Sequence, residues 1–236
     1  MKRRLIFTAL LCMTALCGLA QVKNYDIEVG DFSSLNVLDN INVTYESDAS
    51  RAGTAVFDCQ QNIADGLIFN NNMHGKLTIQ VSTEVLDTPN LPTLHVYSKS
   101  LSHAENAGDS LLTLRKVKAD KELKVVLSDN GRIDVTNVTT RQLELQLLTG
   151  KGIVMASGRC DKLVAKVLGK GTIDALEVKA REIRAHMTGT GTIDVDATGV
   201  DLQVRGSGTG RINYLGAPTN LKVRKIGPLK INQLDP

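Results

Sequence analysis

The feature that most constrains the fold of this chain is a repeat about twenty residues long in its C-terminal half. Each unit has a short run in which apolar and polar residues alternate, then a glycine corner, then a second short run of the same kind. A constant period of this length is typical of solenoids, in which each unit stacks on the next. The first apolar residues of successive units lie 20, 20, 20, 19 and 19 residues apart and are Leu123, Leu143, Leu163, Ile183, Leu202 and Leu221.

The composition of the units predicts strands. Alternation with a period of two means that each strand buries one face, and glycine allows positive φ or a corner without a side chain. No helix-length pattern lies between the strands, and so short a unit needs neighbours to form a core. The sequence therefore predicts an all-β right-handed parallel β-helix, the hand following from the usual hand of parallel crossovers. A β-sandwich would not explain the constant period.

The segment before the repeats is rich in β patterns but has no period. Most of the few aromatic residues lie there, including Phe32, Phe57 and Phe69. Because the end of a solenoid exposes an unpaired edge, we expect residues 21–100 to form irregular opening coils and a cap. Residues 101–114 resemble a degenerate transitional rung, and regular repeats fill 101–236. We expect one domain over 21–236. Strands are expected at 35–37, 41–43, 67–69, 77–81 and 94–97.

Residues 1–20 have the order of a secretory signal peptide. A basic start at Lys2, Arg3 and Arg4 precedes an apolar run, and the small residues Gly18 and Ala20 occupy the two positions that a signal peptidase reads before a cleavage site after Ala20. An uncleaved anchor and lipidation at Cys17 are the alternatives. Removal of this leader takes away three basic residues and leaves 25 basic against 25 acidic residues. A neutral chain gives no electrostatic case for nucleic acid binding, and no other stretch is apolar enough to cross a membrane.

Two cysteines remain after the leader, Cys59 and Cys160. An oxidising compartment permits a disulfide between them, but they lie in different structural regions, and a lone cysteine is usually a small buried side chain. The sequence leaves both readings open.

The outward positions of the strands separate by charge. On the second strands of the units they are Asp134, Asp174, Asp194, Asn213 and Asn232. On the first strands they form a predominantly basic stripe, which would place cations about 4.8 Å apart along the stack and suit an anionic glycan or phosphate. The alternative is a pair of solvated faces that keep the sheets soluble. The candidate ligand-binding residues of the basic stripe are Lys124, Lys166, Arg184, His186, Arg205, Lys222 and Arg224.

Nothing in the sequence singles out a catalytic, metal or cofactor site. The four histidines lack metal-ligand spacing, and no Gly-x-Ser-x-Gly turn is present. Each repeat unit places at most one aspartate in the middle of its second strand. This does not match the closely spaced nine-residue repeats with which β-rolls bind calcium in their turns. A lyase or glycosidase of the β-helix type is the enzyme alternative, although no pair of carboxylates stands out for glycoside hydrolysis.

The whole pattern resembles a known family. The segment Phe32-Ser33-Ser34-Leu35-Asn36-Val37, followed by repeated Gly-x-Gly-Thr-Ile-Asp units at 169–174 and 189–194, is similar to the putative auto-transporter adhesin, head GIN domain family. The resemblance runs from about Phe32 onward. It implies a β-helical fold, export by a Gram-negative bacterium and a surface-binding role, and it brings no catalytic residues.

Together these observations predict a non-catalytic exported protein of the envelope or cell surface. It would lie in the periplasm, at the outer membrane or outside the cell, and would bind a surface glycan, another polyanion or a protein. A structural or assembly role in the envelope is the remaining alternative.

Overall fold

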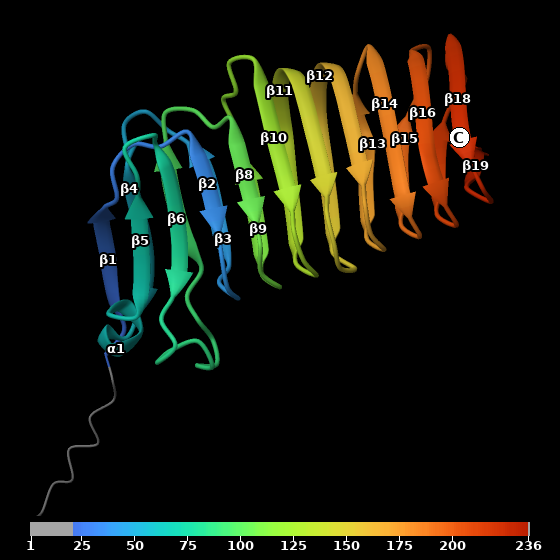
Figure 1. Cartoon of the computed structure of the whole chain (residues 1–236). Helices are drawn as coiled ribbons and strands as arrows, with labels where there is room; N and C mark the ends of the chain where they lie inside the picture. Colours follow the sequence, from blue (N-terminus) through green and yellow to red (C-terminus); the bar gives the residue numbers. More distant parts are fainter. Residues whose placement is uncertain (1–20, 236) are drawn as a thin grey trace, which may run out of the picture.

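The computed structural model describes residues 21–235, and these form a β-solenoid of about seven turns (Figure 1). Strands make up 60% of the chain and helix 2%. The predicted signal peptide and Cys17 lie outside the described residues. The β-helical prediction is confirmed, whereas its right-handed sense stays a prediction. No helix among residues 21–235 is long and apolar enough to span a membrane.

Two long faces of the solenoid bound the core, and each is a nearly continuous ladder of strands. Beyond the register irregularities of β11, β12 and β13, a short further pairing adds the fully buried Val138 and Val178. The first face is parallel apart from its end strand β5, which pairs antiparallel with β6. From the N-terminal end it runs through β5 (Leu67–Asn71), β6 (Lys76–Val81), β2 (Ser34–Val37), β8 (His103–Asn106), β10 (Glu122–Leu127), the second halves of β11 (Arg132–Leu147) and β12 (Ile153–Val167), β14 (Glu182–Gly189), β16 (Asp201–Gly208) and β18 (Asn220–Ile226).

The second face has the same construction, with two antiparallel pairings at its N-terminal end, β1 on β4 and β4 on β7. The short helix α1 (Gln61–Ala64) links β4 to β5. From the N-terminal end this face runs through β1 (Lys23–Glu28), β4 (Thr54–Cys59), β7 (Leu94–Ser98), β3 (Val43–Ser47), β9 (Leu111–Arg115), the first halves of β11 and β12, β13 (Thr172–Lys179), β15 (Thr192–Asp196), β17 (Arg211–Leu215) and β19 (Lys230–Leu234).

The N-terminal rungs do not follow the order of the sequence. The first coil, made by β2 and β3, lies between the β6–β7 coil and the β8–β9 coil. The described chain therefore begins at the outer end with β1 and moves inward to the β2–β3 coil. It then returns outward to build the end with β4 and β5, and passes the β2–β3 coil again on its way from β6 and β7 to β8 and β9. Sequence patterns anticipated β2, β5, β6 and β7, but they missed β1 and β4 and placed β3 too early, at 41–43. The supposed degenerate rung at 101–114 is a regular one, since β8 and β9 pair in register on both sides.

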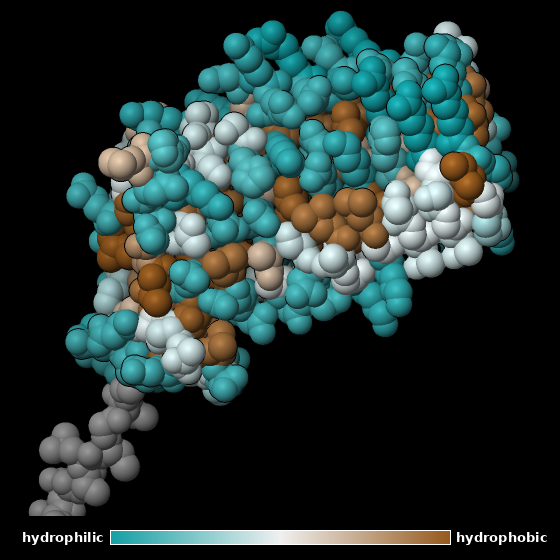
Figure 2. Space-filling view, in the orientation of Figure 1, coloured by the Kyte–Doolittle hydropathy of each residue, from teal (hydrophilic) through white to brown (hydrophobic). Residues whose placement is uncertain are grey.

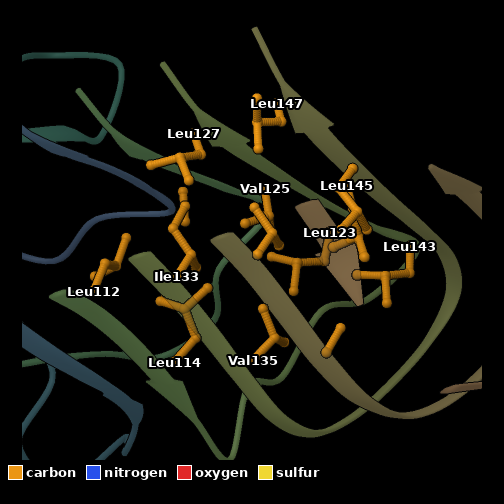
Figure 3. Packing of buried hydrophobic residues seen from close by; sticks show 14 of the residues in the cluster. Leu112, Leu114, Leu123, Val125, Leu127, Ile133, Val135, Leu143, Leu145 and Leu147 are labelled. Atoms are coloured by element: carbon orange, nitrogen blue, oxygen red, sulfur yellow. The ribbon is translucent and has the colours of Figure 1, made fainter. Parts of the chain in front are cut away.

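The core consists of columns of aliphatic side chains pointing inward from both faces. Figure 3 shows Leu123 and Val125 of β10 and Leu143 and Leu145 of β11 pointing into the space between the sheets, with Ile133 opposite. All five side chains are fully buried. Because equivalent positions pair in register from rung to rung, the inward side chains of each rung stack on those of the rung before it and shield them from water.

The glycine corners act mainly through close approach between rungs. The second glycine of each corner packs on the corner below, and a Cβ on Gly171 would lie 2.3 Å from the carbonyl oxygen of Gly152. A Cβ on Gly191 would likewise lie 2.4 Å from the carbonyl oxygen of Gly171. Among the first glycines, Gly150 has φ of 72° and Gly189 has φ of 133°. The expectation of positive φ or a corner free of side chains therefore holds. The second glycines meet only the close approach, whereas a first glycine such as Gly189 combines positive φ with a close approach, since its Cβ would lie 2.5 Å from the Gly169 carbonyl oxygen.

One side chain fills a gap in the core near the C-terminal end. Gly206 lies at the inward position that Met187 fills one rung earlier, and Leu229 packs into the space, fully buried, where a Cβ on Gly206 would be 2.9 Å from its Cδ2. Lys225 follows in the same column, and its Nζ donates to the Leu229 carbonyl at 2.8 Å. A lysine in an inward position makes the last rung polar where earlier rungs are apolar.

Both described cysteines are free and buried. Cys59 lies on β4 and Cys160 on β12. Burial raises the pKa of Cys59, and burial raises the pKa of Cys160 to about 11. The sequence left open whether Cys59 and Cys160 form a disulfide or are separate buried side chains. In the structure they are separate buried side chains.

Candidate binding surface

The predicted basic stripe lies on one sheet, the first face, in two adjacent outward columns. One column holds Lys124, Glu144, Val164, Arg184, Gln203 and Lys222. The next holds Val126, Gln146, Lys166, His186, Arg205 and Arg224. The structure thus brings all seven predicted residues together along β10 to β18. The register of the strands puts neighbours in a column one rung apart, about 4.8 Å.

The middle of the stripe is largely neutralised by carboxylates. Lys166 Nζ lies 2.6 Å from Glu144 Oε1, and Arg184 Nε lies 2.7 Å from Glu182 Oε1. Burial works against ionisation of Glu144, but hydrogen bonds from Lys166 and Gln146 outweigh it and lower its pKa. Glu144 is therefore a carboxylate at neutral pH and offsets the charge of Lys166.

His186 adds no charge to the stripe at neutral pH. Burial lowers its pKa below the ordinary value, and the positive charges of Lys166, Arg205 and Arg184 lower it further. A neutral imidazole therefore separates Lys166 from Arg205 in this column.

The free positive charge of the stripe is concentrated at its C-terminal end. Arg205, Lys222 and Arg224 form no ion pair with any residue of 21–235. Arg205 and Arg224 are direct neighbours in one column of β16 and β18, and Lys222 lies on β18 in the other column. On the side of the molecule that Figure 2 shows, hydrophilic side chains crowd the upper part of the C-terminal half, and apolar patches lie over the middle, the N-terminal end and the outer C-terminal edge. Lys124 also forms no ion pair with residues of 21–235, but it lies alone at the other end of the stripe, beside Glu144. Of the seven predicted residues, only Arg205, Lys222 and Arg224 form a cluster of cations without ion pairs in the described chain.

The second face carries the predicted acidic and amide column. Asp174 pairs with Asp194, Asp194 with Asn213, and Asn213 with Asn232. Asn213 Nδ2 donates to Asp194 Oδ1 at 2.6 Å, and Asn232 Nδ2 donates to Asn213 Oδ1 at 2.9 Å. Burial, together with the neighbouring charge of Asp174, raises the pKa of Asp194. This column is a hydrogen-bonded ladder that ties successive rungs together. No three His, Cys, Asp or Glu residues of 21–235 gather as a set of metal ligands.

A shallow groove on the second face was not predicted from the sequence. It has a volume of about 360 Å³ and lies where the pairing of β11 with β12 and of β12 with β13 slips by one residue. Asn137 has φ of 54° at the first irregularity, and a Cβ on Gly158 would lie 2.1 Å from the Val138 carbonyl oxygen. An isolated Gly158 outside the corner register was the one signal in the sequence for this irregularity.

The chemistry of this groove differs from that of the stripe. Its lining includes Asp134, Asp174 and Glu177, and Arg132 Nε lies 2.7 Å from Asp134 Oδ1. Met155 lies in register between Asp134 and Asp174, so the two carboxylates are two rungs apart, about 10 Å. That spacing is at the upper limit for the carboxylate pair of an inverting glycosidase, and the arginine neutralises one member.

Comparisons with known proteins show the family and the fold of the chain. The model of the family described as putative auto-transporter adhesin, head GIN domain, matches residues 31–218. A crystal structure of a putative adhesin from Bacteroides fragilis is 19% identical, with a TM-score of 0.77 over 91% of this chain and 97% of that chain. A putative adhesin from Parabacteroides distasonis is 20% identical, with a TM-score of 0.73 over 92% of this chain and 98% of that chain.

A second protein from Parabacteroides distasonis, described as a putative lipid binding protein, is 18% identical. Its TM-score is 0.68 over 92% of this chain and 98% of that chain. A search of curated proteins found no match. At these identities the solved structures show a shared fold.

Proposed function

Since the chain belongs to the putative auto-transporter adhesin, head GIN domain family, we propose that it is a non-catalytic binding module of the bacterial envelope or cell surface. Its ligand is an anionic polymer such as a glycan, held by the C-terminal end of the first face. The observation that carries the proposal is the cluster of Arg205, Lys222 and Arg224 on a regular sheet, without carboxylate partners in the described chain.

The geometry of this cluster suits a polymer better than a small ligand. A regular ladder of outward side chains is not a concave pocket of the kind that encloses small ligands. It offers charges at about 4.8 Å intervals along the solenoid axis. Arginine also donates to carboxylate, sulfate or phosphate oxygens in a bidentate manner, and two of the three cations are arginines.

The predicted export of the chain supports the same role. The leader expected at residues 1–20 would take the chain to the periplasm, the outer membrane or the cell surface, where a surface-binding protein would act. The name of the lipid-binding neighbour suggests an anionic headgroup as a second source of the same chemistry.

The carbohydrate-active enzyme is the weaker alternative. Its best location is the groove beside Met155, but this groove is shallow and Arg132 pairs with one of its two strand carboxylates. An enzyme of this type would need an acid and a base that are free to exchange protons across a bound sugar.

The binding proposal is tested with an anionic polysaccharide, polygalacturonate, and with neutral dextran as the reference polymer. Replacing Arg205, Lys222 and Arg224 by Ser removes three cations. At about 1 kcal/mol for each cation near an anionic surface, the loss of affinity for polygalacturonate is roughly 100-fold.

The matched control replaces Lys151, Lys170 and Arg211 by Ser, three exposed cations away from the first face. This control changes the net charge by the same amount, so we expect it to lose less than about fivefold. Equal losses in the two triple variants, or no binding by the unaltered protein, would overturn the proposal.

A further inference from the structure

Charge is distributed unevenly along the solenoid axis. Residues 21–98 contain ten Asp and Glu against three Lys and Arg, whereas residues 99–236 contain fifteen against twenty-two. The two parts therefore carry formal charges of −7 and +7. Residues 21–98 supply every strand of the N-terminal end, and residues 99–236 supply every rung from β8 onward (Figure 1). Residues 21–236 together carry no net charge, but their two parts carry opposite charges, so the molecule is strongly dipolar along the solenoid axis.

The C-terminal end is an open, basic edge. Within the described part of the chain, β18 pairs only with β16, and β19 pairs only with β17. Leu221 and Val223 continue core columns but are 41% and 42% exposed, and Ile226 is 78% exposed. The basic residues of this last rung are Lys222, Arg224, Lys225 and Lys230.

The N-terminal end is an open, acidic edge. Among the strands of residues 21–235, β1 pairs only with β4, and β5 pairs only with β6. Asp26 and Glu28 are exposed on β1 and form no ion pair with residues of 21–235. Ile68 on β5 is 45% exposed. Exposed acidic residues close to this end are Asp58, Asp65, Glu84 and Asp87.

The two ends correspond face by face. β5 and β18 are the end strands of the first face, and both expose apolar side chains, Ile68 and Ile226. β1 and β19 are the end strands of the second face, with Asp26 and Glu28 on one and Lys230 on the other. Stacking one molecule on the next along a common axis would place like faces together, apolar against apolar and acidic against basic.

We propose that the C-terminal end of one molecule docks on the N-terminal end of a second copy, in a head-to-tail arrangement. Two C-terminal ends would instead bring at least eight cations together, with Lys225 at an inward position of each, and like charges at an interface oppose association. A heterologous contact of this kind leaves a free end on each side, so it extends into linear chains.

The size of the ends predicts a weak, reversible contact. A strand of seven residues is about 23 Å long, and two sheets about 10 Å apart with their outward side chains span about 20 Å. Each end thus offers about 450 Å², and the pair buries about 900 Å². This is below the about 1,200 Å² of stable complexes, so association needs high concentration and low salt.

The experiment is analytical ultracentrifugation of the exported, leader-free protein over a range of concentrations. The acidic-end variant carries Asp26→Lys and Glu28→Lys and has two basic ends. The basic-end variant carries Lys222→Glu and Lys230→Glu and has two acidic ends. The unaltered protein should associate in about 0.05 M salt and dissociate in about 0.5 M salt, where the Debye length falls below about 5 Å.

Each variant alone should associate at least about tenfold more weakly than the unaltered protein, and an equimolar mixture of the two should regain association. Three results would overturn the proposal. One is a protein that stays monomeric at every concentration. Another is association of either variant alone at the unaltered strength. The third is association that appears only on phosphatidylglycerol vesicles, which would identify the basic end as a lipid-binding surface.

Discussion

Gly171 is the position at which the stacking explanation makes its sharpest stability prediction. A Cβ at this position would lie 2.3 Å from the Gly152 carbonyl oxygen and 2.4 Å from Leu147 Cδ1. A carbon and a carbonyl oxygen normally approach to about 3.3 Å, so the two corners would have to separate by about 1 Å. Thr172 N donates to that same carbonyl at 3.0 Å, and a shift of this size would break the hydrogen bond.

The cost of Gly171→Ala follows from these contacts. Overpacking against Leu147 costs about 1–3 kcal/mol, and loss of the Thr172 hydrogen bond adds about 1 kcal/mol. We expect the substitution to lower the free energy of unfolding by about 2–4 kcal/mol, measured by urea denaturation and far-UV circular dichroism.

Gly169→Ala in the same corner is the matched control. Its nearest contact would be Thr149 Cα at 3.3 Å, and its φ lies outside the positive region. We expect a loss below about 1 kcal/mol. Equal losses at the two positions, or no loss at Gly171, would contradict the explanation that close approach of the rungs demands the second glycine.

Three further predictions concern the core, the stripe and the thiols. Leu145→Ala should cost about 2–5 kcal/mol because Leu145 is fully buried, whereas Leu168→Ala, at a side chain 53% exposed, should cost below about 0.5 kcal/mol by the same denaturation assay. The pKa of Glu144 is lowered from its ordinary 4.5, so the stabilisation by ionised Glu144 is present above that pH and is lost as the pH falls through the folded-state pKa. Between about pH 5 and 3, Tm should therefore fall more steeply for the unaltered protein than for Glu144→Gln. Parallel curves of Tm against pH would contradict the ion pair. Cys59 and Cys160 should react with a thiol reagent only after unfolding, and fewer than two reactive thiols in the unfolded, leader-free protein would show that they are bridged.

The regular half of the fold could be predicted because its pattern is local. Strand, corner and second strand recur within twenty residues, so the inward columns of Leu123 and Leu143 follow directly from the sequence. The opening coils could not be predicted in this way. The coil of β2 and β3 packs between coils that come later in the chain, and no period connects Leu35 with Leu77 and Ala104, its partners in space.

The candidate surface shows a similar division. Alternation correctly placed Lys124 through Arg224 on one outward face. It did not show which of these cations are neutralised, since the partners of Lys166 and Arg184 depend on side-chain positions. Summing the charge over the whole chain also concealed the separation between residues 21–98 and the rest, although that separation is present in the sequence.

The central claim is that a polyanion binds at the C-terminal end of the first face. The most direct measurement is a titration of isotope-labelled protein with an oligogalacturonate, followed by backbone amide chemical shifts. The proposed site predicts that shifts concentrate on β16 and β18, around Arg205 and Arg224, with little change on β13 and β15. Shifts centred on Met155 and Asp174 would place the ligand in the groove of the second face, and would contradict the claim.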